Sequence, residues 1–187
     1  MTREEILEAA AQIFRQKGYH ATSMQDIAMA VNLQKASLYY HVSSKQEILL
    51  ALLDKALDLL TTDMQNIVAL PLSADEKLKQ AICVYLTALA EHSDLAAVLL
   101  LEHRSLDPDL RQSHFPRRDR FERLWRDLIQ EGVDQGLFHS EDPNMAARAV
   151  LGVMNWTITW YRPGGSMTAD EIGRFFADLF LNGLLIR

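Results

Sequence analysis

Side chains suited to binding phosphates or the edges of bases are concentrated between residues 25 and 45. Lys35 and Lys45 carry point charges, and the hydroxyl and imidazole groups between them can bond phosphate oxygens. The polar groups of Gln25, Lys35 and Ser37 can also reach base edges. These residue types indicate contacts with nucleic acid if one surface presents them together.

Two short helices joined by a tight turn are predicted to position these side chains. Ser23 and Asp26 have the spacing of a helix start, in which the hydroxyl caps the first amides and the carboxylate favours the positive helix end. We expect this helix to continue to Val31. Asn32, a residue type that tolerates the left-handed conformation, is expected to make the turn. The second short helix is expected from about Gln34 to His41.

Longer helices are predicted on both sides of this pair. Apolar residues recur at three-and-four spacing over residues 6–14, and Lys17-Gly18 supplies a C-terminal stop. Ser43-Ser44 offers a cap for a long helix that Pro71 terminates. A short helix, a tight turn and a second short helix form the arrangement in which the second helix enters the major groove while the first braces the backbone.

The rest of the chain is also predicted to be helical, so we expect an all-α protein of about nine helices. A loop is expected at Asp107-Pro108-Asp109, and Thr168 to Glu171 has the capping-box pattern. The remaining helices are expected over residues 74–91, 95–103, 117–135, 143–161 and 168–186.

Composition and charge indicate a small module joined to a larger one. The 187 residues are 49% hydrophobic and 24% charged, which is typical of a compact chain rather than a disordered one. Residues 1–49 carry five cations and five anions, so the whole net charge of −6 belongs to the remainder.

The segment from Ile6 to Leu53 closely resembles the DNA-binding part of the TetR family. The matching positions are Ala9-Ala10, Phe14, Lys17-Gly18-Tyr19, Thr22-Ser23, Ile27-Ala28, Lys35, Ser37-Leu38-Tyr39-Tyr40-His41 and Ser44-Lys45. The resemblance implies a transcriptional repressor with a helix-turn-helix domain at 1–46, which binds palindromic operator DNA. It also implies a larger helical domain at 47–187, which dimerises and senses a small molecule.

The same resemblance implies which residues face DNA. Lys45 is expected to meet a phosphate, and Gln25 reaches from the first of the two short helices. Ala36 stands where the family usually has Gly, so the operator of relatives is not carried over. Tyr39 and Tyr40 could instead be core aromatics, but two adjacent helical residues cannot both face one core. The implied set is Gln25, Lys35, Ala36, Ser37, Tyr39, Tyr40, His41 and Lys45.

The last two predicted helices are apolar on more than one side. One stripe of the first contains Ala149, Gly152, Val153, Trp156 and Trp160, and another contains Val150, Met154, Thr157 and Tyr161. The final helix presents Ile172, Phe175, Phe176, Leu179 and Gly183. Packing within one subunit is the alternative, but we favour a homodimer because a helix-turn-helix protein gains affinity by binding two half-sites.

An aromatic face with cations at one end is predicted on the helix that begins near Arg117. A step of 100° per residue places Phe121 and Trp125 on one face, and Arg117 and Arg118 lie one turn upstream. This arrangement suits an amphipathic ligand with an anionic head, since Arg is well shaped for phosphate. An ordinary solvated helix end is the alternative.

A second resemblance concerns the C-terminal part of the chain. It rests on Met154-Asn155-Trp156, Trp160-Tyr161-Arg162-Pro163, Gly164-Gly165, Ile172, Phe176 and Gly183. These residues look like TetR-type regulators of lipid and fatty-acid breakdown, whose effectors are acyl-CoA thioesters. The resemblance implies a repressor of lipid-degradation genes that an acyl-CoA releases; a sensor of another hydrophobic molecule or drug is the alternative. The implied ligand residues are Arg117, Arg118, Phe121, Trp125, Asn155 and Trp156.

Patterns of catalytic or metal-binding residues are not found in the sequence. The six histidines occur singly, and neither metal-ligand spacing nor a G-x-S-x-G motif is present. We therefore expect no catalytic residue, metal or cofactor. A helical enzyme acting on thioesters through Glu102-His103 or His92 is the distant alternative.

The expected compartment is the cytoplasm. Cys83 is the single cysteine, which excludes an intramolecular disulfide and fits a reducing compartment. Apolar runs stay well below the roughly 18 residues of a membrane span. We expect no membrane partner.

Overall fold

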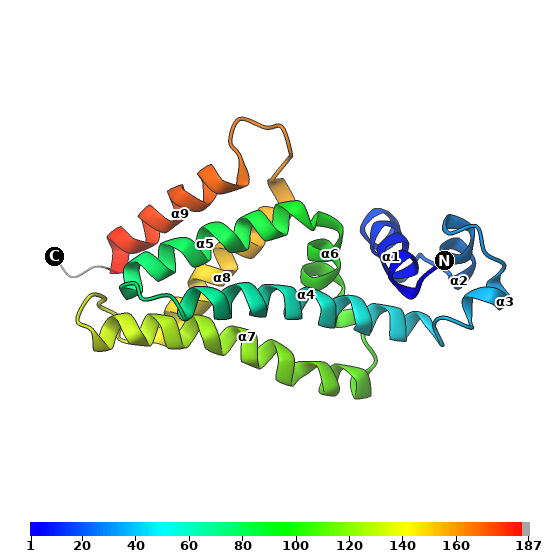
Figure 1. Cartoon of the computed structure of the whole chain (residues 1–187), viewed down its shortest axis with the longest axis horizontal. Coiled ribbons are helices and arrows are strands. Elements are labelled where there is room, and N and C mark those ends of the chain that lie inside the picture. The colour runs from blue at the N-terminus through cyan, green and yellow to red at the C-terminus, as the bar shows by residue number, and fades with distance from the viewer. Residues whose placement is uncertain (185–187) are drawn as a thin grey trace. The chain divides into compact units, whose positions relative to one another are not determined.

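A computed structural model describes residues 1–184, which form nine α-helices and no strand (Figure 1). The helices are α1 (Arg3–Lys17), α2 (Met24–Ala30), α3 (Lys35–Leu38), α4 (Lys45–Val68), α5 (Ala74–Glu91), α6 (Ser93–Ala97), α7 (Pro108–Asp134), α8 (Pro143–Trp160) and α9 (Ala169–Leu184). A π-helical turn (Val98–Glu102) and a 3-10 turn (His103–Ser105) follow α6. The predicted all-α fold of about nine helices is confirmed, and the expected last residues of α9, 185 and 186, lie outside the described residues.

Two compact units divide the chain. The first contains residues 1–57 and 92–117, and the second contains residues 58–91 together with the chain from 118 onward. Helices α4 and α7 therefore each supply residues to both units. The division into domains at residue 46 stays a prediction.

The core of the first unit joins the three N-terminal helices to a segment that comes much later in the chain. Phe14 of α1, Ile27 of α2 and Leu38 of α3 are buried together with Val98 and Leu106. Full burial of such side chains stabilises a fold by about 1.5 to 3 kcal/mol each. Residues 92–117 are therefore part of the structure that supports α2 and α3.

Most of the predicted helix starts and turns are present. Ser23 and Asp26 form the expected capping box, as do Thr168 and Glu171. Asn32 adopts a φ of 54°, the left-handed conformation expected of it. Helix α3 ends at Leu38, earlier than expected, because the backbone N–H groups of Tyr40 and His41 bond three residues back rather than four.

The expected loop at Asp107-Pro108-Asp109 and the expected helix start at Arg117 are both wrong. Helix α7 begins at Pro108 and continues through Pro116. Proline fits the first position of a helix because its φ is already helical and the N–H it lacks would have no partner there. The carbonyl of Asp107 accepts the N–H of Arg111 at 2.8 Å, so this segment is the first turn of α7.

Close helix packing in the second unit depends on two glycines. A Cβ atom at Gly173 of α9 would lie 2.8 Å from the Cα of Cys83 on α5. A Cβ at Gly132 of α7 would lie 2.1 Å from the buried ring of Phe138. Larger residues at either position would push these elements apart.

Candidate DNA-binding surface and ligand cavity

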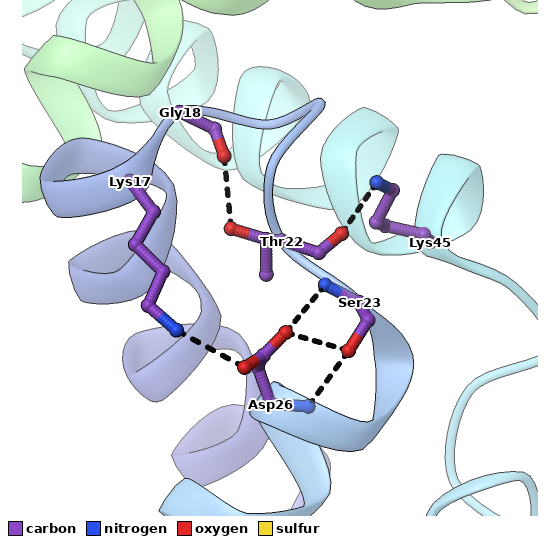
Figure 2. A network of polar contacts seen from close by, with 6 residues as sticks. All are labelled: Lys17, Gly18, Thr22, Ser23, Asp26 and Lys45. Carbon is purple, nitrogen blue, oxygen red and sulfur yellow. Dashed lines mark hydrogen bonds and ion pairs between the residues drawn. The ribbon is translucent and has the colours of Figure 1, made fainter.

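A polar network holds the loop between α1 and α2 (Figure 2). The Asp26 carboxylate accepts the backbone N–H of Ser23 at 2.8 Å, the Ser23 hydroxyl at 2.5 Å and the Lys17 ammonium at 3.0 Å. These bonds from Ser23 and Lys17 hold the pKa of Asp26 well below its usual range. The hydroxyl of Thr22 donates to the Gly18 carbonyl at 2.8 Å. The start of α2 is thereby fixed relative to α1.

Lys45, the first residue of α4, closes the other side of this network. Its ammonium donates to the carbonyls of Tyr19 and Thr22 at 2.8 and 2.6 Å, and it lies 4.3 Å from the centre of the Tyr19 ring. Burial lowers the pKa of Lys45, although the carboxylates of Asp26 and Glu102 oppose this effect. Two of its three N–H groups therefore bind the protein itself, and this role was not visible in the sequence.

The residues expected to face DNA lie mostly on the solvent side of the short helices. Gln25, Lys35 and Ala36 are exposed, whereas Ser37, His41 and Lys45 are partly buried. Tyr39 and Tyr40 are 46% and 90% exposed, which confirms that they do not share one core. Met29 at the end of α2 is also exposed, a feature that the sequence analysis missed.

The segment after α6 is bonded to the helix-turn-helix within the first unit. Glu102 accepts the backbone N–H of Tyr19 at 3.1 Å. The Gln46 side chain donates to the Ser105 carbonyl at 2.9 Å and accepts the Asp107 N–H at 3.0 Å. These contacts connect residues 102–107 to both ends of the DNA-binding segment.

The two arginines expected to bind an anionic head are engaged with carboxylates. The Nε of Arg117 lies 3.4 Å from Asp54, which also pairs with the buried His114 at 2.8 Å. Arg118 donates from Nε to Glu122 at 2.8 Å. Both arginine side chains are about half exposed, at 46% and 47%. An anionic ligand would therefore compete with these carboxylates.

A cavity lies inside the second unit between α4, α5 and α7. It encloses about 190 Å³, part of which is open to solvent. Its only charged lining group among the described residues is the Asp63 carboxylate. The lining residues are Leu60, Asp63, Met64, Ile67, Ala81, Val84, Tyr85, Phe121 and Trp125.

Three aromatic rings form one wall of the cavity. Tyr85 stacks on Phe121 with ring centres 5.9 Å apart and meets the edge of Trp125 at 5.7 Å. The Tyr85 hydroxyl donates to Oδ1 of Asn155 at 2.6 Å. Burial raises the pKa of Tyr85, so the phenol stays protonated at neutral pH. The structure thus brings Phe121, Trp125 and Asn155 of the predicted ligand set to one place.

Trp125 has a buried polar atom without an acceptor. Its side chain is 1% exposed, and no group within residues 1–184 accepts a hydrogen bond from its Nε1–H. An unpaired buried donor costs about 1 to 3 kcal/mol. Nothing in the sequence signalled this feature, because it depends on which side chains surround the indole.

Trp156, another predicted ligand residue, lies on a different side of α8 from the aromatic wall. It is 65% exposed, whereas its neighbour Asn155 is partly buried. Trp156 is one of the large apolar side chains exposed on α8 and α9, a set that we call the α8–α9 face. Its members are Val153, Trp156, Trp160, Phe175 and Leu179. The two expected stripes of α8 therefore differ, since Val150, Met154 and Thr157 are buried in this chain.

The described residues offer neither a cluster of metal ligands nor a single helix that could span a membrane. Within residues 1–184, no group of three or more His, Cys, Asp or Glu side chains could hold a metal ion. No single helix in that part of the chain is long and apolar enough to cross a membrane. Only a bent pair, Ala74–Glu91 followed by Ser93–Ser105, meets the test of length and composition.

Two family models cover most of the chain. Residues 6–52 match the model of bacterial regulatory proteins of the tetR family, and residues 71–184 match the tetracyclin repressor-like C-terminal domain. The chain therefore belongs to the TetR family of transcriptional regulators. Regulators of this family bind operator DNA as dimers.

Individual relatives point to lipid metabolism. The HTH-type transcriptional repressor KstR2 of Mycobacterium tuberculosis is 30% identical over 97% of this chain and 92% of its own length. The fatty acid metabolism regulator protein of Bacillus subtilis is 24% identical over 96% of this chain and 94% of its length. The structure of AibR in complex with isovaleryl coenzyme A and operator DNA has a TM-score of 0.86 and 26% identity, covering 98% of this chain and 97% of AibR.

Proposed function

We propose that this protein represses genes of lipid or fatty-acid degradation and that an acyl-CoA releases it from its operator. The observation that carries the proposal is the aromatic cavity around Tyr85, Phe121 and Trp125, in a chain that also has a TetR-type DNA-binding segment. AibR, whose structure holds isovaleryl coenzyme A and operator DNA, supports an acyl-CoA effector, and the fatty acid metabolism regulator of Bacillus subtilis supports lipid metabolism as the regulated process. The protein acts by binding rather than by catalysis.

Base recognition is assigned to α2 and α3. Gln25, Lys35 and Ser37 read base edges, and Lys45 meets a phosphate with its remaining N–H. The other members of the surface, Ala36, Tyr39, Tyr40 and His41, set the register through the backbone. Lys35→Ala should relax discrimination at one position of each half-site by about 1 to 3 kcal/mol. Lys45→Ala should instead weaken binding to all sequences and lower the salt slope by about one.

The α8–α9 face is assigned to a homodimer. Five of its large apolar side chains are exposed on α8 and α9, which follow each other in the chain, and exposed apolar groups of this kind mark an interaction surface. A palindromic operator requires a twofold protein, with recognition helices about 34 to 36 Å apart or a multiple of that distance. Leu179→Arg should give a monomer in sedimentation and remove tight operator binding. A dimer that survives this substitution in dilute solution would place the interface elsewhere.

The acyl group is assigned to the cavity, and the CoA phosphates to Arg117 and Arg118. Trp125 and Phe121 contact the acyl group and Asn155 acts through Tyr85, whereas Trp156, which is exposed on the α8–α9 face, is assigned to the homodimer. Binding by the arginines requires that the ligand phosphates displace Asp54 and Glu122. Arg118→Ala should therefore weaken acyl-CoA more than the matching free fatty acid, since only the former carries phosphates.

A titration of acyl-CoAs into the protein–operator complex tests the proposal. Ligand and operator must weaken each other by the same factor, commonly about 5- to 150-fold. A thermal-shift series of acyl-CoAs, free fatty acids and cationic dyes identifies the class that binds the fold. Operator binding that no acyl-CoA of any chain length changes would refute an acyl-CoA effector.

The second candidate effector is a cationic lipophile. Asp63 places a carboxylate in an otherwise apolar and aromatic cavity, which suits a drug or dye with a positive charge. Asp63→Asn should abolish binding of such a ligand and leave acyl-CoA binding intact. The thermal-shift series above therefore separates the two effectors.

A further inference from the structure

We propose that the cavity is specific for an acyl group bearing a keto or hydroxyl oxygen, and that Trp125 recognises this oxygen. The inference rests on the proposed acyl-CoA function and refines the substrate class of the same site. It starts from the indole Nε1–H of Trp125, which is buried and has no acceptor within residues 1–184. A plain hydrocarbon chain would leave this donor unpaired, whereas an oxygen on the chain would satisfy it.

The neighbouring side chains do not meet this need. Tyr85 meets Trp125 through a perpendicular ring contact, and its hydroxyl is committed to Asn155 at 2.6 Å. Phe121, the third ring, has no polar atom. The remaining walls are aliphatic apart from the Met64 thioether and the Asp63 carboxylate. None of these groups accepts the indole N–H, so we assign its acceptor to the ligand.

The charge of the cavity restricts what that acceptor can be. The Asp63 carboxylate repels a ligand carboxylate, so the free acid end of a fatty acid is disfavoured in this space. Keto and hydroxyl oxygens are neutral acceptors, and a hydroxyl can also donate to Asp63. A site built to bond such an oxygen rejects the analogue that lacks it more strongly than an apolar site distinguishes one methylene.

The size of the cavity favours a short acyl group. The volume of about 190 Å³ includes space open to solvent, so the enclosed part is smaller still and we choose six-carbon probes. The probes are hexanoyl-CoA and the oxo- and hydroxyhexanoyl-CoAs substituted at successive carbons beyond the one next to the thioester. Isothermal titration to the full-length protein gives the affinity of each probe. The best oxygenated probe should bind about tenfold more tightly than hexanoyl-CoA.

Trp125→Phe is the variant that tests the role of the donor. It keeps an aromatic ring but removes the N–H, so the preference for the oxygenated probe should disappear while hexanoyl-CoA still binds. Loss of packing alone would weaken both probes alike and leave their ratio unchanged. Equal affinities in the unaltered protein, or a preference that survives Trp125→Phe, would overturn the inference.

A second measurement uses the unaltered protein and therefore applies even if Trp125→Phe does not fold. The indole N–H signal of Trp125 in a proton NMR spectrum of the unaltered protein should move downfield with the oxygenated probe and remain in place with hexanoyl-CoA. An identical response to both probes would contradict the inference. Failure of every acyl-CoA to bind would refute the proposed function as well, whereas binding without preference would refute the oxygen specificity alone.

Discussion

The loop between α1 and α2 and the wall of the cavity differ in whether their polar groups have partners in the protein. The charged groups of Asp26 and Lys45 bond to partners in the same chain, so the geometry is settled without DNA. In the wall of the cavity, the Nε1–H of Trp125 has no acceptor, and the rings of Tyr85 and Phe121 meet the indole only through edge contacts. A DNA-reading element needs a fixed shape before it binds, while a sensor needs a group whose best partner is the ligand.

The largest expected effect comes from overpacking α7 in the unit that contains the cavity. Gly132→Ala places a methyl group 2.1 Å from a ring atom of Phe138, which is itself buried. We expect a loss of about 3 kcal/mol in the free energy of unfolding, because overpacking a dense core forces side chains out of their rotamers. Urea denaturation measures it. Gln130→Ala on the exposed face of the same helix should change stability by less than about 0.5 kcal/mol.

Removing the ammonium of Lys45 tests the DNA-reading side. Lys45→Ala leaves the carbonyls of Tyr19 and Thr22 without their charged donor, so we expect a loss of about 2 kcal/mol in stability. Lys35→Ala removes an exposed ammonium of the same kind and should cost less than about 0.5 kcal/mol. Equal losses in urea denaturation would mean that the DNA-free loop does not depend on Lys45.

A smaller effect is expected at Tyr85, which lines the cavity but has a partner for its polar group. Tyr85→Phe keeps the stacked ring but removes the hydroxyl that donates to Asn155. The expected loss is about 1 kcal/mol. Because burial raises the pKa of Tyr85, the phenol stays a donor and the difference between variant and parent should not change between neutral pH and pH 9. A difference that shrinks over this range would show that the phenol ionises.

The smallest expected effect concerns Asp26 and appears only in acid. Bonds from Ser23 and Lys17 lower the pKa of Asp26 in the fold below the roughly 3.9 of an unfolded chain. The unfolded chain therefore takes up a proton first, and the stabilisation present above about pH 4 is lost as the pH falls. The melting temperature of Asp26→Asn should fall less steeply with acid than that of the parent. Identical slopes would contradict this role.

Local signals in the sequence predicted the helix starts well. Ser23 with Asp26, and Thr168 with Glu171, form their boxes through side chains only three residues apart, so sequence alone specifies them. The helix start at Pro108 was missed because Asp-Pro-Asp also marks loops.

Contacts between distant residues were beyond the reach of the sequence. The partners of Lys45 are backbone carbonyls 23 and 26 residues away, which carry no signature of residue type. The predicted ligand residues came from α7 and α8, although α4 and α5 supply most of the cavity lining. Tyr85 could have been suspected from its place on the apolar side of α5. The unpaired state of Trp125 could not, since it depends on what surrounds the indole.

The close approach of Gly173 to Cys83 gives the single thiol of this chain a distinctive reactivity. An alkylating reagent adds atoms where the backbone of α9 leaves no space for a Cβ. Burial also raises the pKa of Cys83, which lowers the fraction of reactive thiolate at neutral pH. Cys83 is partly exposed, so we expect its alkylation to be slow while α9 lies against α5 and faster when the two helices separate. Since α9 also carries Phe175 and Leu179, the rate of Cys83 alkylation reports on the movement of the helix that we assign to the dimer interface.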